Sequence, residues 1–252
     1  MISKKSFLVL LILLSNLQLC FAQTVTRGNV NTWGLLLNRF YLSEKLNITN
    51  ELHERTGDFL KDQATFIFRP SVDYEIHDHV ELSIGYSFVR SWPYSPYSQP
   101  IPKNEHNIWE QVFLSSRVGK VNIQHRFRFE HRFIDNIVVR YPNINPLAEI
   151  DGTTFANRFR YRIIVSFDLF KLNHGKHTIF FNGFDELWIN QADNLLPQSY
   201  ARNWIYTGIG YRFDKDFNIQ LAHMHQYDAN GANNFISSSI IQLSLFKNFK
   251  LY

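Results

Sequence analysis

The sequence predicts an all-β protein, an antiparallel transmembrane up-and-down β-barrel of ten to twelve strands behind an N-terminal signal peptide. Two observations carry this prediction. From Trp33 to the C-terminus, apolar and polar residues alternate with a period of two, and no segment keeps a helical period. The connections between these segments alternate between short and mostly longer ones, as in outer-membrane barrels with short periplasmic turns and long outer loops.

The composition excludes two other classes of protein. The 252 residues include 23 Phe, 12 Tyr and 5 Trp, and only 19% of the residues are charged. A disordered chain contains fewer aromatic residues than this. A polytopic helical membrane protein needs runs of about 20 apolar residues, whereas the longest run here extends from Phe7 to Leu14, and the mean hydropathy is −0.23.

Residues 1–22 have the organisation of a secretory signal peptide. Lys4 and Lys5 form its charged region, an apolar run too short to span a bilayer follows, and the segment ends on the small residue Ala22, after which we expect cleavage. This divides the chain into a signal peptide (1–22), a short lead segment (23–31) and a barrel (32–252).

Cleavage would remove Cys20, the only cysteine, so the mature chain would have no disulfide and no thiolate chemistry. The two lysines would leave with it, and the remaining charge is too close to balance to indicate a nucleic-acid partner.

The clearest alternation extends from Val121 to Phe133, and the segments 157–167 and 80–88 repeat it. Because successive side chains of a strand point to opposite faces of the sheet, one face of each segment should meet lipid and the other the lumen. We expect the lipid-facing set to include Phe127, Phe129, Phe159, Tyr161, Ile163, Leu82 and Ile84.

Eleven segments qualify as strands: 32–42, 46–56, 62–75, 80–90, 105–117, 121–133, 155–169, 177–190, 200–213, 218–227 and 235–250. A strand of about eleven residues, tilted by about 40°, is long enough to cross the hydrocarbon core of a membrane. The longer connections are predicted at 91–104, 134–154, 191–199 and 228–234.

An odd count conflicts with the even strand numbers of bacterial single-chain barrels. We therefore favour twelve strands, with 24–31 supplying a short extra one, over ten strands, in which 32–42 is not a full wall strand. Pro70 cannot donate to the ladder of a central strand, so we expect a bulge or bend there.

Several short motifs follow one another in a specific order: Leu42-Ser43-Glu44-Lys45-Leu46, Arg69-Pro70, Gly85-Tyr86, Glu105-His106-Asn107-Ile108-Trp109-Glu110-Gln111, His125 to Arg132, Asn157 to Arg162, Asp185-Glu186 and Gly208-Ile209-Gly210-Tyr211. In these motifs the chain resembles, from Trp33 onward, the outer-membrane β-barrel proteins grouped as domain of unknown function 2490. The family usually has Gln-Asn-Arg ahead of the last Gly-Tyr run. This chain has Arg202-Asn203-Trp204 there, with the arginine moved two positions on the same face. The resemblance implies a barrel and its compartment, and it brings no established activity or catalytic residues.

Two neighbouring predicted strands carry charged ladders. An arginine on the lipid face near the bilayer midplane costs about 2–4 kcal/mol, so these side chains should face the lumen. There we expect acids from neighbouring strands, among them Glu105 and Glu110, to neutralise them. The predicted lumenal charge network consists of Arg126, Arg128, Glu130, Arg132, Arg158, Arg160, Arg162, Glu186 and Arg202.

The network allows two interpretations. Guanidinium forks match phosphate and carboxylate groups, so the lumen could attract or bind a small anion. Alternatively, arginine–carboxylate pairs fill the lumen and hold the barrel shut, which the sequence favours because small barrels have little open interior.

Ten histidines raise the question of a metal site. His77 and His79 flank Asp78, and His223 and His225 share a strand face. A transition metal needs a third or fourth ligand, and the sequence marks none. We expect no metal and no other cofactor.

The loop 91–104 is rich in aromatic residues and proline. It fits a lid or glycan-binding loop, or a stiff outer loop whose Trp92 and Tyr94 join the interfacial aromatic belt. The sequence favours the second interpretation, because loops vary freely.

Serines occur on several predicted strands, but no G-x-S-x-G context surrounds them, and we expect no catalytic residues. The enzyme alternative is an outer-membrane lipid hydrolase that uses a Ser/His pair. A third alternative is a soluble periplasmic ligand-binding barrel, which would turn the Phe faces inward and the arginines outward.

The predicted function is therefore structural, or binding and transport of a small anion, in the cell outer membrane of a Gram-negative bacterium. The expected partners are outer-membrane lipid, the barrel-assembly machinery that inserts such proteins, and a small anionic ligand. The sequence does not indicate an oligomeric state.

Overall fold

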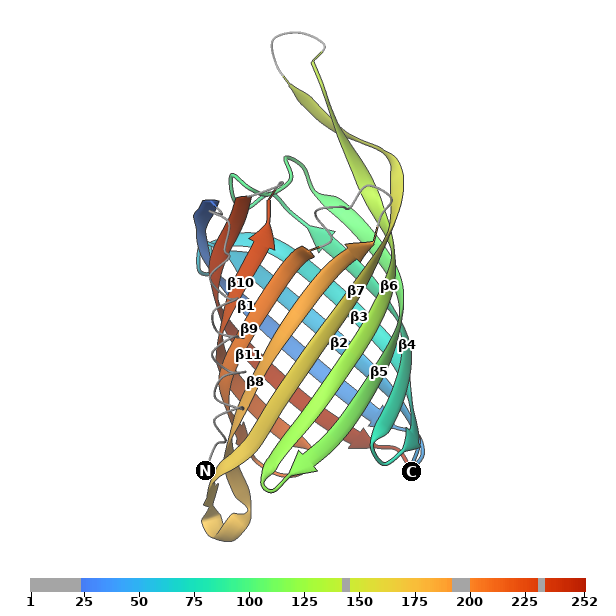
Figure 1. Cartoon of the computed structure of the whole chain (residues 1–252), viewed down its shortest axis with the longest axis vertical. Helices are drawn as coiled ribbons and strands as arrows, with labels where there is room; N and C mark the ends of the chain where they lie inside the picture. The colour runs from blue at the N-terminus through green and yellow to red at the C-terminus, as the bar shows by residue number, and fades with distance from the viewer. Residues whose placement is uncertain (1–23, 142–145, 192–199, 231–233) are drawn as a thin grey trace, which may run out of the picture.

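The computed structural model describes residues 24–141, 146–191, 200–230 and 234–252. They form one closed barrel of eleven tilted strands, each paired with its neighbours in chain order (Figure 1). The strands are β1 (Thr24–Tyr41), β2 (Leu46–Gly57), β3 (Asp62–His77), β4 (Val80–Ser91), β5 (Lys103–Val118), β6 (Val121–Arg140), β7 (Leu147–Leu172), β8 (His177–Gln191), β9 (Tyr200–Arg212), β10 (Phe217–Ala229) and β11 (Asn234–Lys250). The predicted signal peptide, 1–22, lies outside the described residues.

The barrel closes through one parallel pair, β1 with β11, while every other pair of neighbouring strands is antiparallel. An odd number of alternating strands leaves the first and last pointing the same way, so the closing pair must be parallel. The strand count falls within the predicted ten to twelve, but the preference for twelve is wrong. Residues 24–31 do not form a separate strand; from Thr24 on they are the first part of β1, so the predicted lead segment belongs to the barrel.

All eleven predicted strands are present, and the main difference lies at the β6–β7 hairpin. The ladder between β6 and β7 continues to the pair Arg140–Leu147, so most of the predicted loop 134–154 is a two-stranded ribbon. This ribbon projects beyond the rim of the barrel (Figure 1). The run Ile137-Val138-Val139 explains the extension, because β-branched residues favour extended backbone.

Pro70 lies in β3 opposite Asn50 of β2. The ladder between β3 and β4 lapses at Arg69 and Pro70 and resumes at Ser71 in an unchanged register. The missing N–H donor is therefore accommodated by a gap in one ladder, and of the predicted bulge or bend, the bulge does not occur there.

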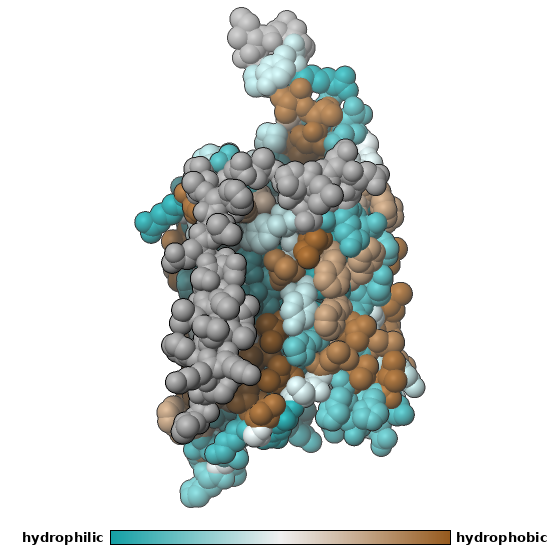
Figure 2. Space-filling model, viewed as in Figure 1, coloured by the Kyte–Doolittle hydropathy of each residue, from teal (hydrophilic) through white to brown (hydrophobic). Residues whose placement is uncertain are grey.

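The outer face of the wall is largely apolar, and the residues predicted to face lipid lie on it. Ile84 is 61% exposed, and Leu82 and Phe127 are also exposed. Figure 2 shows hydrophobic residues over the wall and hydrophilic residues gathered at the end with the short turns.

Aromatic side chains gather near both ends of the wall. At the short-turn end the ring centroids of Phe40 and Phe249 are 4.9 Å apart. At the opposite end those of Tyr227 and Phe235 are 4.7 Å apart. Two aromatic girdles around an apolar band are typical of barrels that stand in a membrane. No helix in the described part of the chain has the length and apolar character of a bilayer span.

The core of the molecule lies inside the lumen. Two strand glycines leave room for inward rings there: a Cβ on Gly85 would come within 2.2 Å of the Trp109 ring, and one on Gly210 within 2.2 Å of the Phe180 ring. A cluster of buried apolar residues lies on the inner side of β8, β9, β10, β11 and β1; it contains Trp33, Trp188, Trp204, Tyr206, Ala222, Met224 and Ile240.

Candidate functional site

The lumen contains a cavity of about 820 Å³ that is lined by residues from both ends of the barrel. Gly28 and Tyr94 line it at the end with the longer connections, and Tyr41 and Asn248 line it near the short turns. The interior is therefore only partly filled by side chains.

The predicted arginine ladders face each other inside this lumen. On β6 and β7, Arg126 lies opposite Arg162 and Arg128 lies opposite Arg160. Like charges in directly opposed strand positions repel each other. The arrangement is stable only because carboxylates are placed between the guanidinium groups.

Glu186 of β8 is the first of these carboxylates. It is fully buried and accepts hydrogen bonds from Arg126, from Arg160 Nε at 2.8 Å and from Arg162 Nη2 at 2.5 Å. One carboxylate thus binds arginines of both ladders. In a water-poor interior such charge-assisted bonds are strong.

Glu130 of β6 is the second. It is fully buried and accepts from Arg158 Nε at 2.5 Å and from Arg160 Nη1 at 2.8 Å. Arg160 therefore bridges Glu130 and Glu186, which joins the predicted residues of β6, β7 and β8 into one network.

The other predicted network members have different partners. Arg132 forms two 2.7 Å hydrogen bonds with the carboxylate of Glu105. Arg202 is ion-paired with Asp228 of β10, so it lies in the lumen but in a separate pair. The suggestion that Glu110 joins the network is wrong. Its side chain is 55% exposed on the outer face, 3.5 Å from His131.

Arg128 is nearly fully buried and has no carboxylate partner among the described residues. It donates Nε to Gln111 Oε1 at 2.9 Å, and its Cζ lies 4.0 Å from the centroid of the Trp109 ring, a cation–π distance. The indole N–H of Trp109 donates to Ser87 Oγ at 2.9 Å. Within the described residues, Arg128 is therefore held by a neutral amide and an aromatic ring rather than by a carboxylate.

The sequence reasoning missed several lumenal residues. Glu51 and Arg69 form a 2.8 Å ion pair on β2 and β3, and Asp73 and Glu81 lie within 4 Å of Arg39 near the short turns. These residues could have been predicted from strand parity, the rule that residues an even number of positions apart in a strand face the same side. Each lies an even number of positions from other inward residues of its strand.

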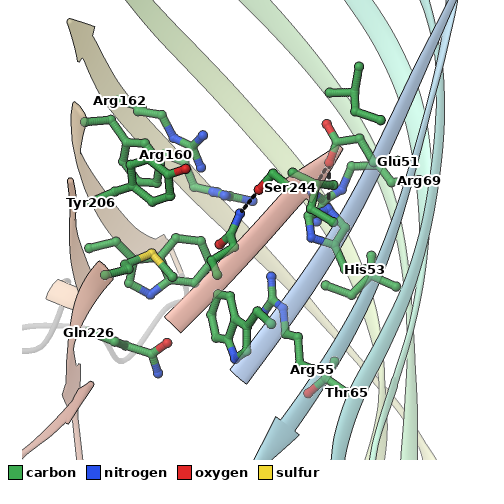
Figure 3. Close-up of a pocket in the computed structure, with 18 of the residues that line it drawn as sticks. Glu51, His53, Arg55, Thr65, Arg69, Arg160, Arg162, Tyr206, Gln226 and Ser244 are labelled. Atoms are coloured by element: carbon green, nitrogen blue, oxygen red, sulfur yellow. Dashed lines mark hydrogen bonds and ion pairs between the residues drawn. The ribbon is translucent and has the colours of Figure 1, made fainter. Parts of the chain in front are cut away.

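The cavity lining is strongly basic. In Figure 3, Arg160 and Arg162 lie across the open space from Arg55 and Glu51. Glu130 and Glu186 do not line the cavity. They form ion pairs with Arg160 and Arg162 on the side of these arginines that faces away from the open space. The lining contains ten arginines and four acidic residues: Arg39, Arg55, Arg69, Arg126, Arg132, Arg158, Arg160, Arg162, Arg202 and Arg212, with Glu51, Glu81, Glu105 and Asp228.

The 91–104 loop reaches into the cavity mouth. Tyr94 lines the cavity and packs over Gly57, where a Cβ would lie 2.2 Å from the tyrosine ring. Burial raises the pKa of the Tyr94 hydroxyl, so the group stays protonated. Ser98 Oγ accepts from the backbone N–H groups of Tyr94 and Ser95, which stiffens the loop. Tyr94 therefore belongs to the lumen rather than to the outer aromatic belt.

The histidine pairs have separate surroundings. The rings of His77 and His79 are 5.8 Å apart. His223 Nε2 lies 2.6 Å from Ser239 Oγ, and His225 Nε2 lies 2.7 Å from Ser237 Oγ, both on the outer face of the wall. Within the described ranges, no three His, Cys, Asp or Glu side chains gather in a way that could hold a metal ion.

Comparison with known proteins yields one match. The model of a family described as protein of unknown function (DUF2490) matches residues 30–236. No curated protein and no solved structure matches the chain. The matched range begins in β1 and ends in β11, so it includes all the charged residues described above.

Proposed function

Because the chain belongs to DUF2490, a family of proteins of unknown function, we propose a function from the chemistry of its own lumen: an outer-membrane barrel that binds small anions in a narrow, arginine-lined interior and lets them pass, without a catalytic role. The observation that carries the proposal is the excess of arginines over acids on the cavity lining.

The membrane location is supported by the apolar outer face, the two aromatic girdles and the signal-like residues 1–22. Insertion would require the barrel-assembly machinery. A soluble barrel would need the opposite arrangement, with phenylalanines inside and arginines in water. Extraction is a direct test: the protein should stay with membranes in carbonate and leave them only in detergent, and its release by carbonate would contradict the location.

The anion preference follows from electrostatics. A cleft lined by charges of one sign, with low-dielectric walls, focuses the field and concentrates counter-ions. Arg55 should contribute most to this positive field, because it lines the cavity and contacts no carboxylate among the described residues. Arginines that are already paired, such as Arg132 with Glu105, attract a mobile anion less.

Halide flux tests this function. The full chain, refolded into liposomes, should admit chloride, measured with a halide-quenched dye, faster than it admits potassium, measured in parallel liposomes with a potassium-sensitive dye. Arg55→Gln should slow chloride entry. Lys215→Gln, in the exposed β9–β10 turn, should not change it. Equal chloride and potassium entry would contradict the anion function, and absence of any flux would leave only the interpretation of a barrel held shut by its charges.

A lipid hydrolase is the second candidate, because the structure contains two Ser–His contacts on the outer face. A serine nucleophile needs a histidine within hydrogen-bond reach, which Ser237 with His225 and Ser239 with His223 satisfy. It also needs a group that orients the histidine. In the described part of the chain neither ring contacts a carboxylate. Each pair also has a non-catalytic explanation: a polar side chain that faces lipid needs a hydrogen-bond partner within the protein, and the serine and histidine supply one for each other.

The hydrolase candidate is tested with phospholipid substrates and refolded protein. Turnover that Ser237→Ala or Ser239→Ala abolishes would replace the non-catalytic proposal. Turnover that neither variant changes would exclude both Ser–His pairs as its source, and no turnover would leave the anion function as proposed.

A further inference from the structure

Three lumenal tryptophans from separate strands meet on one side of the cavity. Trp33 of β1, Trp188 of β8 and Trp204 of β9, together with Arg55 of β2, form what we call the tryptophan cage. The ring centroids of Trp33 and Trp204 are 5.3 Å apart, and those of Trp188 and Trp204 are 4.6 Å apart. All four residues line the cavity, and each is more than nine-tenths buried.

The cage is surrounded by positive charge. The Cζ atom of Arg55 lies 3.8 Å from the centroid of the Trp33 ring. Around the Trp204 ring, the Cζ atoms of Arg55, Arg160 and Arg202 lie 5.5, 5.9 and 5.7 Å from the centroid. Arg160 and Arg202 are ion-paired with carboxylates, whereas Arg55 has no carboxylate partner among the described residues. One buried cation of the cage is therefore available to an incoming anion.

Three buried donors of the cage have no acceptor in the described part of the chain: Nε1 of Trp188, Nε1 of Trp204 and Nε of Arg55. Buried polar groups in folded proteins are nearly always hydrogen-bonded to protein or to ordered water. Trp109 illustrates the usual case, because its indole N–H donates to Ser87 Oγ at 2.9 Å. Three unsatisfied donors beside one cavity indicate a site for a molecule rich in acceptors.

The same cavity also presents buried acceptors without donors, namely Gln226 Oε1 and Asn31 Oδ1. Gln226 lies opposite Trp204 in the β9–β10 ladder. Its amide nitrogen donates to Asp228 Oδ2 at 2.5 Å, so reversing the amide would turn its oxygen toward a carboxylate. Figure 3 shows Gln226, Arg55 and Arg160 around the same open space. Chloride or sulfate would satisfy the donors and leave these acceptors unpaired.

We propose that the tryptophan cage binds an anionic sugar, a sugar ring that carries a phosphate or carboxylate group. Arg55 and the two indole N–H groups take the anionic oxygens, the amide oxygens of Gln226 and Asn31 accept from hydroxyl groups, and the indole rings pack against the C–H face of the sugar. The tryptophan cage lines one part of the lumenal cavity, whose whole volume of about 820 Å³ leaves room for a ligand of the size that small-molecule sites of roughly 300–1,000 Å³ hold. The inference rests on the proposed anion function and names the class of anion.

Isothermal titration calorimetry on the refolded full chain in detergent tests the proposal with four probes: glucose 6-phosphate, glucuronate, glucose and inorganic phosphate. At least one of the two charged sugars should bind at least tenfold more tightly than both glucose and inorganic phosphate. If only one of them does, that result selects phosphate or carboxylate as the group recognised. If neither charged sugar binds at least tenfold more tightly than both glucose and inorganic phosphate, the proposal is overturned.

Two matched variants locate the site. Trp188→Phe keeps an aromatic ring and removes one unsatisfied donor, so charged-sugar affinity should fall about tenfold, the loss expected for one hydrogen bond to a charged group. Trp109→Phe removes a donor that is already satisfied and does not line the cavity, so affinity should stay unchanged. Heat-modified migration in gels checks that both variants are folded. Equal effects of the two substitutions would overturn the assignment.

The result also separates this inference from the proposed function. Chloride flux without sugar binding would overturn the cage as a sugar site and leave the anion function intact. Absence of both would overturn both.

Discussion

The substitution Glu186→Gln would remove one negative charge from the centre of the arginine network while preserving side-chain size. The carboxylate is fully buried and forms ion pairs with Arg126, Arg160 and Arg162. A glutamine keeps one acceptor oxygen but replaces the other with an NH₂ group, which would point donors at guanidinium donors. Arginines cannot shed their protons to relieve this conflict, so the network would keep its positive charge.

The size of the effect follows from burial. Removing one partner of a buried ion pair typically costs about 3–5 kcal/mol, because the remaining charge is left uncompensated. Three arginines share Glu186, so we expect a value near the upper end of that range. For a domain of this size each kcal/mol shifts the midpoint of thermal unfolding by about 2–4 °C, so the midpoint should fall by roughly 10 °C or more.

The assay is heat-modified migration of the refolded barrel in gels over a temperature series. Glu44→Gln is the matched control, because Glu44 is exposed in the β1–β2 turn and its loss should leave the midpoint unchanged. If Glu186→Gln and Glu44→Gln have the same midpoint, water or mobile anions solvate the arginines, and the reasoning about a closed network is refuted.

Three further predictions concern packing, orientation and the cavity mouth. Gly85→Ala should destabilise the barrel by about 1–3 kcal/mol in urea unfolding, since the new Cβ would meet the Trp109 ring at 2.2 Å; an unchanged midpoint would show that the ring moves aside freely. Phe129→Cys should react with a lipid-phase thiol probe and Arg128→Cys should not, and the reverse labelling would show that the two faces are misassigned. Tyr94→Ala should widen the mouth and raise single-channel conductance in planar bilayers, and an unchanged conductance would place the narrowest point deeper in the lumen.

Strand parity predicted the wall of the barrel and the inward face of the arginines, because alternation is a local property of each strand. Arg126, Arg160 and Glu186 come together as expected from pairing of consecutive strands. Parity also excludes the prediction that both Glu105 and Glu110 face the lumen, because the two residues are an odd number of positions apart in one strand.

The tryptophan cage could not be predicted in the same way. Trp33 and Trp204 belong to β1 and β9, which become close only once β11 has closed against β1. The closure depends on the strand count, and the even-number rule pointed to twelve. The contact between Arg55 and Trp33 follows from direct cross-strand pairing of β1 with β2. That Arg55 contacts no carboxylate among the described residues depends on the positions of all the other strands, so the sequence could not show it.

The reversal potential of single barrels in planar bilayers tests the central claim, an anion-selective lumen, most directly. Under a tenfold gradient of KCl centred near 0.1 M, the sign should be that of chloride preference. The preference should shrink near 1 M salt, where the screening length falls from about 10 Å to about 3 Å. A reversal potential of zero, or one with the sign of potassium preference, would contradict the claim that the arginine-rich lining of the lumen governs what enters it.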